Sequence, residues 1–147
     1  MLKLQIISDA HLEFRRNPAF FKPSAPILCL LGDICACGTL SGFRIFVNFL
    51  KFASPQFEKI IHVAGNHEYY ATTKNNKKIE QTYEGINVRL ANLKKMFPNY
   101  IFMSNNVFKL RVGKELVYVI GTTLYAFGEL LKCLKETISK VLAAEAD

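Results

Sequence analysis

The sequence predicts an α/β fold built around a parallel sheet, and three observations support this prediction. Apolar runs at residues 2–8, 26–31 and 59–64 are bounded by glycine or proline and have the length of buried strands. Helical patterns separate these runs, which favours βαβ units. Each run is followed directly by a short polar motif. Because ligands of open α/β sheets bind beyond the carboxyl ends of the strands, the motifs should meet at one edge of the sheet.

Two helices are expected within the first hundred residues. Residues 39–53 are crowded with phenylalanine, and their apolar positions fit a period of 3.6, which predicts a buried helix that ends at Ser54-Pro55. Residues 79–97 show one apolar stripe with charged side chains on the opposite face, and Pro98 marks the end of that helix.

The rest of the chain is expected to form short strands and a final helix. The last two of three strand-like segments are joined by Gly113-Lys114, which predicts a hairpin. A last amphipathic helix is expected at residues 128–145. The three strand-like segments are residues 100–103, 107–112 and 116–120.

A chain of 147 residues is the size of one domain, so residues 1–147 are taken as a single domain.

The composition favours an anionic partner. The formal net charge is +7 and the isoelectric point is about 9.3, which fits phosphorylated substrates, nucleic acid or an unspecialised basic surface. The cationic pairs are dispersed, so nucleic acid is not favoured. The amino terminus lacks the apolar core of a signal peptide, and no apolar stretch approaches the ~20 residues that span a bilayer. A cytoplasmic protein without a membrane segment is therefore expected.

Four cysteines are present, and their spacing does not indicate a disulfide framework or a zinc finger. Cys35 and Cys37 are separated by one residue, and no second pair lies nearby. We expect reduced thiols in an intracellular protein. The less favoured alternative is that Cys35 and Cys37 contact a soft metal near the polar motifs.

The three polar motifs together predict a metal site. Asp9 and His11 would point to the same side in a continuation of their strand, so both could hold one ion. Asp33 follows the neighbouring strand, and its two oxygens could bridge two cations. Asn66 offers an uncharged amide oxygen, which suits a borderline-hard ion such as Mn²⁺, Fe or Zn²⁺. The motifs are Asp9-Ala-His11, Gly32-Asp33 and Gly65-Asn66-His67-Glu68.

Three further polar residues lie in or before the third motif. His67 is adjacent to Asn66 and cannot easily point the same way, and an imidazole beside the metal could protonate a leaving group or stabilise negative charge. Glu68 is either a partner that orients a ligand or a carboxylate of the loop, and the two interpretations have equal weight. His62 lies within the third strand, where its alternation favours a core position over a ligand.

The motifs resemble the first three signature blocks of the calcineurin-like metallophosphoesterases, and the resemblance extends from Met1 to about Tyr125. It implies a four-layer α/β/β/α sandwich with a two-metal centre. It also implies that His67 is the catalytic histidine that contacts the phosphoryl group. The implied metal ligands are Asp9 and His11 for the first ion, Asp33 as the bridge and Asn66 for the second ion.

By this resemblance the chain would hydrolyse phosphate mono- or diesters with a metal-activated hydroxide, and one or two divalent ions (Mn, Fe or Zn) would be its cofactors. Its partner would be a phosphate-ester substrate. The segment after Asp33 lacks the Asp-Arg-Gly of the protein Ser/Thr phosphatases, so a protein phosphatase is not expected.

The family supplies further histidines from its second half, including a Gly-His-x-His block, whereas this chain has only His11, His62 and His67. We therefore expect an incomplete sandwich, truncated at the carboxyl terminus, with impaired metal binding. Two alternatives are ligands borrowed from another chain and a minimal single-metal variant. A missing half-sandwich would expose apolar surface on the sheet, through which the chain could associate with itself.

The sequence leaves three functions open. A metal-dependent phosphoesterase, or the remnant of one, is favoured by the triple motif. A catalytically inactive metal-binding remnant or scaffold module is the alternative, and it rests on the missing histidines. A basic nucleic-acid binder without chemistry is the least favoured of the three.

Overall fold

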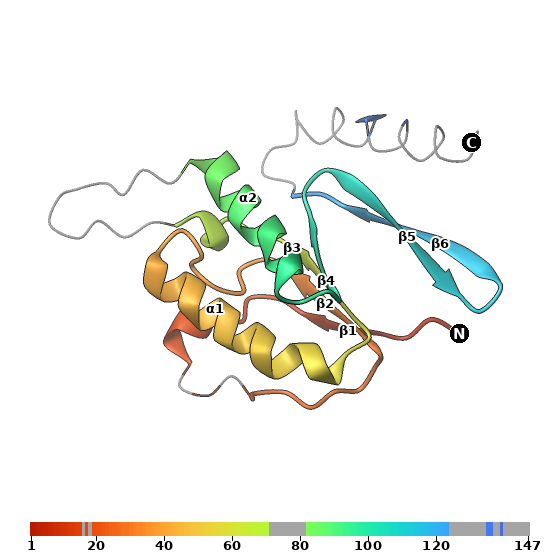
Figure 1. The fold of residues 1–147 in the computed structure, drawn as a ribbon, viewed down its shortest axis with the longest axis horizontal. Helices are drawn as coiled ribbons and strands as arrows, with labels where there is room; N and C mark the ends of the chain where they lie inside the picture. The colour runs from red at the N-terminus through yellow and green to blue at the C-terminus, as the bar shows by residue number, and fades with distance from the viewer. Residues whose placement is uncertain (16, 18, 71–81, 124–134, 137–138, 140–147) are drawn as a thin grey trace, which may run out of the picture. The chain divides into compact units, whose positions relative to one another are not determined.

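The computed structural model describes residues 1–15, 17, 19–70, 82–123, 135–136 and 139. The chain divides into two units (Figure 1). One, the parallel-sheet unit, is Lys3–Phe102, and the other, the hairpin unit, comprises Met1–Leu2 and Met103–Asp147. The helix predicted at residues 128–145 lies almost wholly outside the described residues.

The predicted apolar runs form a four-stranded parallel sheet in the order β1-β2-β3-β4. Each of the first three strands is one to three residues shorter than predicted. Leu30 is the Cα partner of Ile7 in β1 and of His62 in β3, so these three residues share one face of the sheet. The strands are β1 (Leu4–Ile7), β2 (Ile27–Leu31), β3 (Lys59–Val63) and β4 (Tyr100–Met103).

Two helices flank the sheet, and a threonine side chain caps each of them. In α1 (Leu40–Ala53) the Thr39 side chain accepts a hydrogen bond from the N–H of Gly42, and a 3₁₀ turn over Ser54–Gln56 follows the helix. In α2 (Tyr83–Asn92) Thr82 plays the same role. No helix of the described residues is both long and apolar enough to cross a membrane.

The structure tests the prediction for the second helix only in part. The predicted start at residues 79–81 lies outside the described residues, and α2 begins at Tyr83 because Thr82 is its cap. At the other end the α-helix stops at Asn92, and a 3₁₀ turn over Leu93–Lys95 tightens the chain before Pro98. Ile86 and Leu90 of the apolar stripe are buried in α2, whereas Leu93, also buried, belongs to the 3₁₀ turn.

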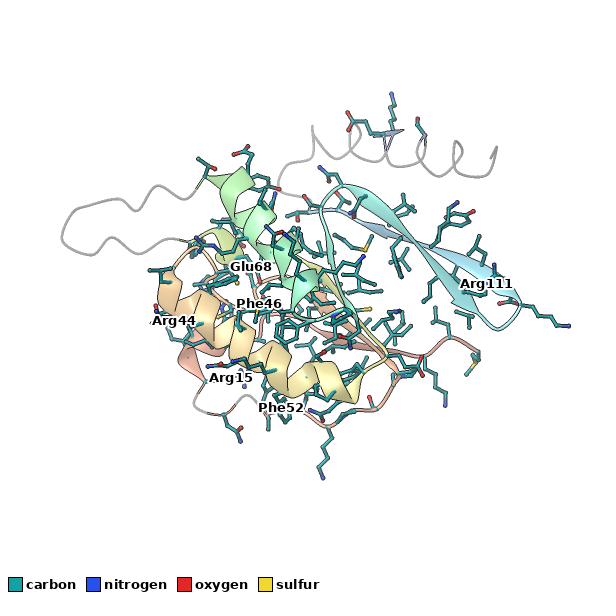
Figure 2. All side chains as sticks on the ribbon, viewed as in Figure 1. Arg15, Arg44, Phe46, Phe52, Glu68 and Arg111 are labelled. Atoms are coloured by element: carbon teal, nitrogen blue, oxygen red, sulfur yellow. The ribbon has the colours of Figure 1, made fainter. Side chains whose placement is uncertain are left out.

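The core of the parallel-sheet unit lies between the sheet and the two helices. Phe46 of α1 is fully buried and lies inside this unit (Figure 2), with its ring centroid 5.0 Å from that of His62 and 6.2 Å from that of Tyr100. Phe43 and Val47 of α1 are partly buried and pack against this core. Other fully buried members are Leu28 and Leu30 of β2, Phe49 and Leu50 of α1, Ile60 of β3 and Leu90 of α2.

The other face of the sheet presents exposed apolar side chains at its β1 edge. Ile6 is the Cα partner of Cys29, so the two residues share this face. Ile6 is 61% exposed and Leu4, two residues away on the same strand, is 45% exposed. Self-association through this exposed surface stays a prediction.

The hairpin unit contains β5 (Asn106–Val112) and β6 (Glu115–Gly121), which pair antiparallel. Val112 pairs with Glu115, so two residues form the turn, as predicted. The first of them, Gly113, has a φ of 62°, which glycine adopts without steric cost. The structure thus confirms the α/β class, with a parallel sheet flanked by helices and a short hairpin.

Candidate metal centre

The loops after β1 and β2 stay side by side beyond the ends of their strands. The backbone N–H of Asp9 donates to the carbonyl of Gly32 at 3.1 Å, and that of His11 donates to the carbonyl of Asp33 at 3.1 Å. The N–H of Leu12 donates a third hydrogen bond to the carbonyl of Ile34 at 2.8 Å, which continues the pairing of the two loops by one residue. The first two motifs are therefore held together by main-chain hydrogen bonds at the carboxyl edge of the sheet.

Asp9, His11 and Asp33 converge at this edge. One ligand atom from each residue can be chosen so that all three lie within 4.8 Å of one another. Asp9 is exposed, whereas His11 and Asp33 are partly buried. Two carboxylates and one imidazole are a donor set that suits a borderline divalent cation. The residues present therefore fit a metal ion.

The route to this convergence differs from the prediction. A continuation of the strand was expected to carry Asp9 and His11, but β1 ends at Ile7. Asp9, His11 and Asp33 instead have φ values of 52°, 44° and 54°, in the left-handed region. For residues other than glycine this conformation costs roughly 1–2 kcal/mol each. Such outliers cluster at functional sites, where the surrounding structure holds them in place.

Two glycines allow the second and third motif loops to approach closely. A Cβ atom on Gly32 would lie 2.9 Å from the Cα atom of Gly65. A Cβ atom on Gly65 would lie 2.7 Å from the backbone nitrogen of Asp33 and would also overlap its Oδ1 atom. The Asp33 carboxylate can therefore occupy this position only because residue 65 is a glycine, which has no Cβ atom.

The third motif contacts Asp33 through the backbone. The N–H of His67 donates to Oδ1 of Asp33 at 2.8 Å. Asn66 is exposed, and its Nδ2 atom donates to the hydroxyl of Tyr70 at 2.6 Å. With the nitrogen of its amide used in this way, Asn66 presents the oxygen to other groups. His67 is thus joined directly to the convergent group, whereas the side chain of Asn66 contacts Tyr70.

Glu68 is fully buried and ties the motif loops together (Figure 2). Its carboxylate accepts the backbone N–H groups of Asp33 at 3.0 Å, Ile34 at 2.7 Å and Gly65 at 2.7 Å. These bonds tie Glu68 to the backbone of the second and third motifs, so it is not a carboxylate of the loop alone. Glu68 binds the backbone of Asp33 rather than its side chain.

The charge of Glu68 is stabilised where it lies. Burial by itself raises the pKa of this carboxyl group, but His62 and the backbone N–H groups of Ile34 and Gly65 outweigh burial and hold the pKa below its usual value. The Nε2 atom of His62 is 3.6 Å from Oε1 of Glu68, so the contact is electrostatic rather than a close hydrogen bond. Glu68 therefore remains a carboxylate in the folded protein.

His62 occupies the core, as its alternation in the strand predicted. It is fully buried, and its Nδ1 atom lies 2.7 Å from the hydroxyl oxygen of Tyr100. Burial raises the pKa of Tyr100 well above its usual value. His62 thus belongs to a buried polar pair beneath α1, and it contacts Glu68 of the third motif.

Cys35 and Cys37 are both fully buried free thiols. The Sγ atom of Cys35 donates to the carbonyl of Gly42 at 3.2 Å. Burial, followed by contact with Cys35, raises the pKa of Cys37 well above its usual value. Because only the thiolate is a good metal ligand, this environment does not favour metal binding by Cys37.

Glu13 was not among the residues predicted from the sequence. Its Oε1 atom lies 2.8 Å from Nδ1 of His67 and 3.9 Å from Nδ1 of His11. His11, Glu13 and His67 form a second group whose ligand atoms lie within 4.8 Å of one another. The sequence signal that could have identified Glu13 as a site residue is its spacing. Glu13 lies two residues after His11, just as His11 lies two residues after Asp9.

Comparisons with known proteins show which family and which solved structure this chain is similar to. The calcineurin-like phosphoesterase family matches residues 2–138. An uncharacterized protein of Acanthamoeba polyphaga mimivirus is 32% identical over 139 residues, which cover 84% of this chain and 44% of that protein. The crystal structure of the phosphopantetheinyl hydrolase of Mycobacterium tuberculosis aligns with a TM-score of 0.57 and 21% identity, over 80% of this chain and 41% of that chain.

The chain spans less than half the length of both relatives. The likeness to the hydrolase, at 21% identity, concerns the fold alone. Together with the family match, it confirms the resemblance on which the fold was predicted.

Proposed function

The chain belongs to the calcineurin-like phosphoesterase family, and on that premise we propose that it takes part in the hydrolysis of phosphate esters with a divalent metal ion. The observation that supports the proposal is the convergence of Asp9, His11 and Asp33, whose ligand atoms lie within 4.8 Å of one another. Members of this family act on phosphate esters, so a phosphate mono- or diester is the proposed substrate class.

Asp9, His11 and Asp33 would hold the first ion, and Asp33 would be shared with a second ion that Asn66 would also bind. Oxygen and imidazole donors suit Mn²⁺, Fe or Zn²⁺, and we propose one of these as the cofactor. A bound divalent ion supplies positive charge beside the phosphoryl group and activates water as a nucleophile at neutral pH.

His67 is the proposed catalytic residue of this chain. Its backbone N–H is bound to Asp33, so the ring starts from a point fixed relative to the metal ligands. The His67 side chain is 17% exposed, so part of it is accessible to solvent. An imidazole in this place can donate a proton to the leaving oxygen or stabilise negative charge on the phosphoryl group.

Activity with a generic substrate tests the proposal. Purified chain is incubated with an aryl phosphate monoester or diester and with Mn²⁺, Fe²⁺ or Zn²⁺ in turn. We expect metal-dependent turnover that Asp33→Asn abolishes. Glu58→Gln is the matched control, because it makes the same carboxylate-to-amide change at an exposed residue before β3. Absence of turnover by the folded wild-type chain with every metal would contradict the proposal.

A second candidate function is a non-catalytic metal-binding or scaffold module. One specific observation favours it, namely that the sequence has three histidines and none after His67. The two candidates differ in metal content, which elemental analysis of the purified chain measures. Two ions per chain favour the enzyme, and one ion or none, together with a lack of turnover, favours the scaffold.

Three further expectations remain proposals. They are a single domain over residues 1–147, a cytoplasmic location, and self-association through the sheet face that exposes Leu4 and Ile6. Analytical ultracentrifugation at several concentrations tests the last of these. A sedimentation coefficient that is independent of concentration and fits a monomer would contradict it.

A further inference from the structure

We propose that Glu13 is a positioning residue that holds the imidazole of His67 through a hydrogen bond from Nδ1 of His67 to Oε1 of Glu13. The inference rests on the proposed function, because it supports the residue that we place at the phosphoryl group. It adds a residue from the loop after β1 to a site otherwise defined by three motifs.

The distances single out His67 as the partner of Glu13. Oε1 of Glu13 is 2.8 Å from Nδ1 of His67 but 3.9 Å from Nδ1 of His11. This oxygen is buried, and in the described residues no well-aligned hydrogen bond satisfies it. Hydrogen bonds of active sites are often poorly aligned before ligands bind, and the distance of 2.8 Å is short enough for this pair to form one. The unsatisfied oxygen and the nearby ring nitrogen therefore belong together.

Glu13 is itself anchored, which a positioning residue requires. It lies in the 3₁₀ turn Leu12–Phe14, and the first residue of this turn is buried and bound through its N–H to the carbonyl of Ile34. The second carboxylate oxygen, Oε2, accepts the backbone N–H of Ala36 at 3.3 Å. One oxygen of the carboxylate is thus held by a backbone group, so the contact of the other oxygen with His67 can restrain the ring.

The ring of His67 needs such a restraint because other partners compete for it. Nδ1 of His11 lies 3.3 Å from Nδ1 of His67, and the two rings meet edge to face with centroids 4.5 Å apart. The ring of Tyr70 lies at 4.7 Å on centroids. A carboxylate only accepts hydrogen bonds, so Glu13 selects the form of His67 that carries its proton on Nδ1. That choice turns Nε2 toward the substrate, to which Nε2 can donate a proton when the ring carries protons on both nitrogens.

Nuclear magnetic resonance on the metal-free chain tests the contact without any activity. The sequence holds only three histidines, so long-range ¹H–¹⁵N spectra at mildly alkaline pH resolve the tautomer of each ring. We expect the His67 proton on Nδ1 in the wild type and in Glu13→Gln, whose side-chain oxygen still accepts. In Glu13→Ala we expect the Nε2 form or a mixture. A wild-type ring with its proton on Nε2 overturns the proposal, whatever the variants do.

Kinetics and metal analysis complete the test. In Glu13→Ala we expect kcat to fall about 10–100-fold, with KM and the number of bound metal ions unchanged, and Glu13→Gln to recover part of the loss. Loss of a bound metal ion in Glu13→Ala overturns the proposal, because it makes Glu13 a ligand. If the wild type shows no turnover, the proposed function fails, and the tautomer of His67 still decides the role of Glu13.

Discussion

Glu68 and Asp33 are joined by a hydrogen bond that spans 35 positions of the sequence. Oε2 of Glu68 accepts the backbone N–H of Asp33 at 3.0 Å and, from the other side, the backbone N–H of Gly65 at 2.7 Å. One buried carboxylate thus satisfies main-chain donors of two separate loops. The predicted bridging ligand is oriented by the residue that closes the third motif, so the motifs form one structural unit.

Replacing this carboxylate by an amide should loosen the site. In Glu68→Gln one oxygen becomes an NH₂ group, which faces backbone donors instead of accepting from them. A buried donor left without an acceptor costs about 1–3 kcal/mol. We expect the free energy of unfolding to fall by that amount in denaturant titrations, and metal affinity to fall with it. Glu58→Gln, at an exposed position, should change stability by less than about 0.5 kcal/mol. Equal stability of the two variants would show that the buried contacts are not needed.

Gly65→Ala should damage the site more than the fold. The new methyl group would lie 2.7 Å from the backbone nitrogen of Asp33 and overlap its carboxylate, so the carboxylate has to move. We expect metal affinity, measured by calorimetric titration, to fall at least tenfold while the far-ultraviolet circular dichroism is preserved. Gly85→Ala is the control, since its methyl group meets only the Thr82 side chain, at 3.3 Å. Normal metal binding by Gly65→Ala would refute the close approach of the two loops.

The left-handed backbone of His11 predicts which of two substitutions at this position gives the more stable protein. At a φ of 44° an alanine suffers the steric cost of roughly 1–2 kcal/mol that a glycine avoids. Glycine has the larger conformational entropy when unfolded, which offsets part of this difference. We therefore expect His11→Gly to be about 0.5–1 kcal/mol more stable than His11→Ala in urea with chelator present. Neither variant should bind metal normally. The opposite order of stability would mean that this turn relaxes to an ordinary conformation.

Much of the fold could be predicted because the local sequence determines it. The apolar runs of β1 to β3 are typical of buried strands, and the Gly113-Lys114 pair between two strand-like segments is typical of a hairpin turn. The end of α2 was less predictable, because the Thr82 side chain and the final 3₁₀ turn depend on hydrogen bonds that a periodic stripe does not specify.

The sequence predicted that Asp9, His11 and Asp33 would lie close together, but it did not predict the geometry that brings them there. The convergence of Asp9 and Asp33 follows from parallel strands ending at one edge, whereas the left-handed turns that produce it have no sequence signal except the tolerance of aspartate for such φ values. The contact of Glu13 with His67 joins two distant parts of the chain through tertiary packing, so spacing alone could not reveal it.

The buried pair of His62 and Tyr100 predicts a loss of stability in alkali. Burial, followed by the negative charges that Cys37 and Glu68 contribute, raises the pKa of Tyr100 well above its usual 10.0. The folded state therefore favours the neutral phenol, and the stability linked to it is complete below pH 10 and is lost as the pH rises above that value. Denaturant titrations at about pH 8 and at several values above pH 10 measure the slope.

Tyr100→Phe separates this effect from other alkaline transitions. The variant loses the contact of its hydroxyl with Nδ1 of His62, so we expect it to be about 0.5–1.5 kcal/mol less stable than the wild type near pH 8. Its stability should fall less steeply above pH 10, because one buried titrating group is gone. Burial also raises the pKa of Cys37 above its usual 9.0, so some alkaline slope should persist in the variant. Identical slopes in the two proteins would contradict the assignment to Tyr100.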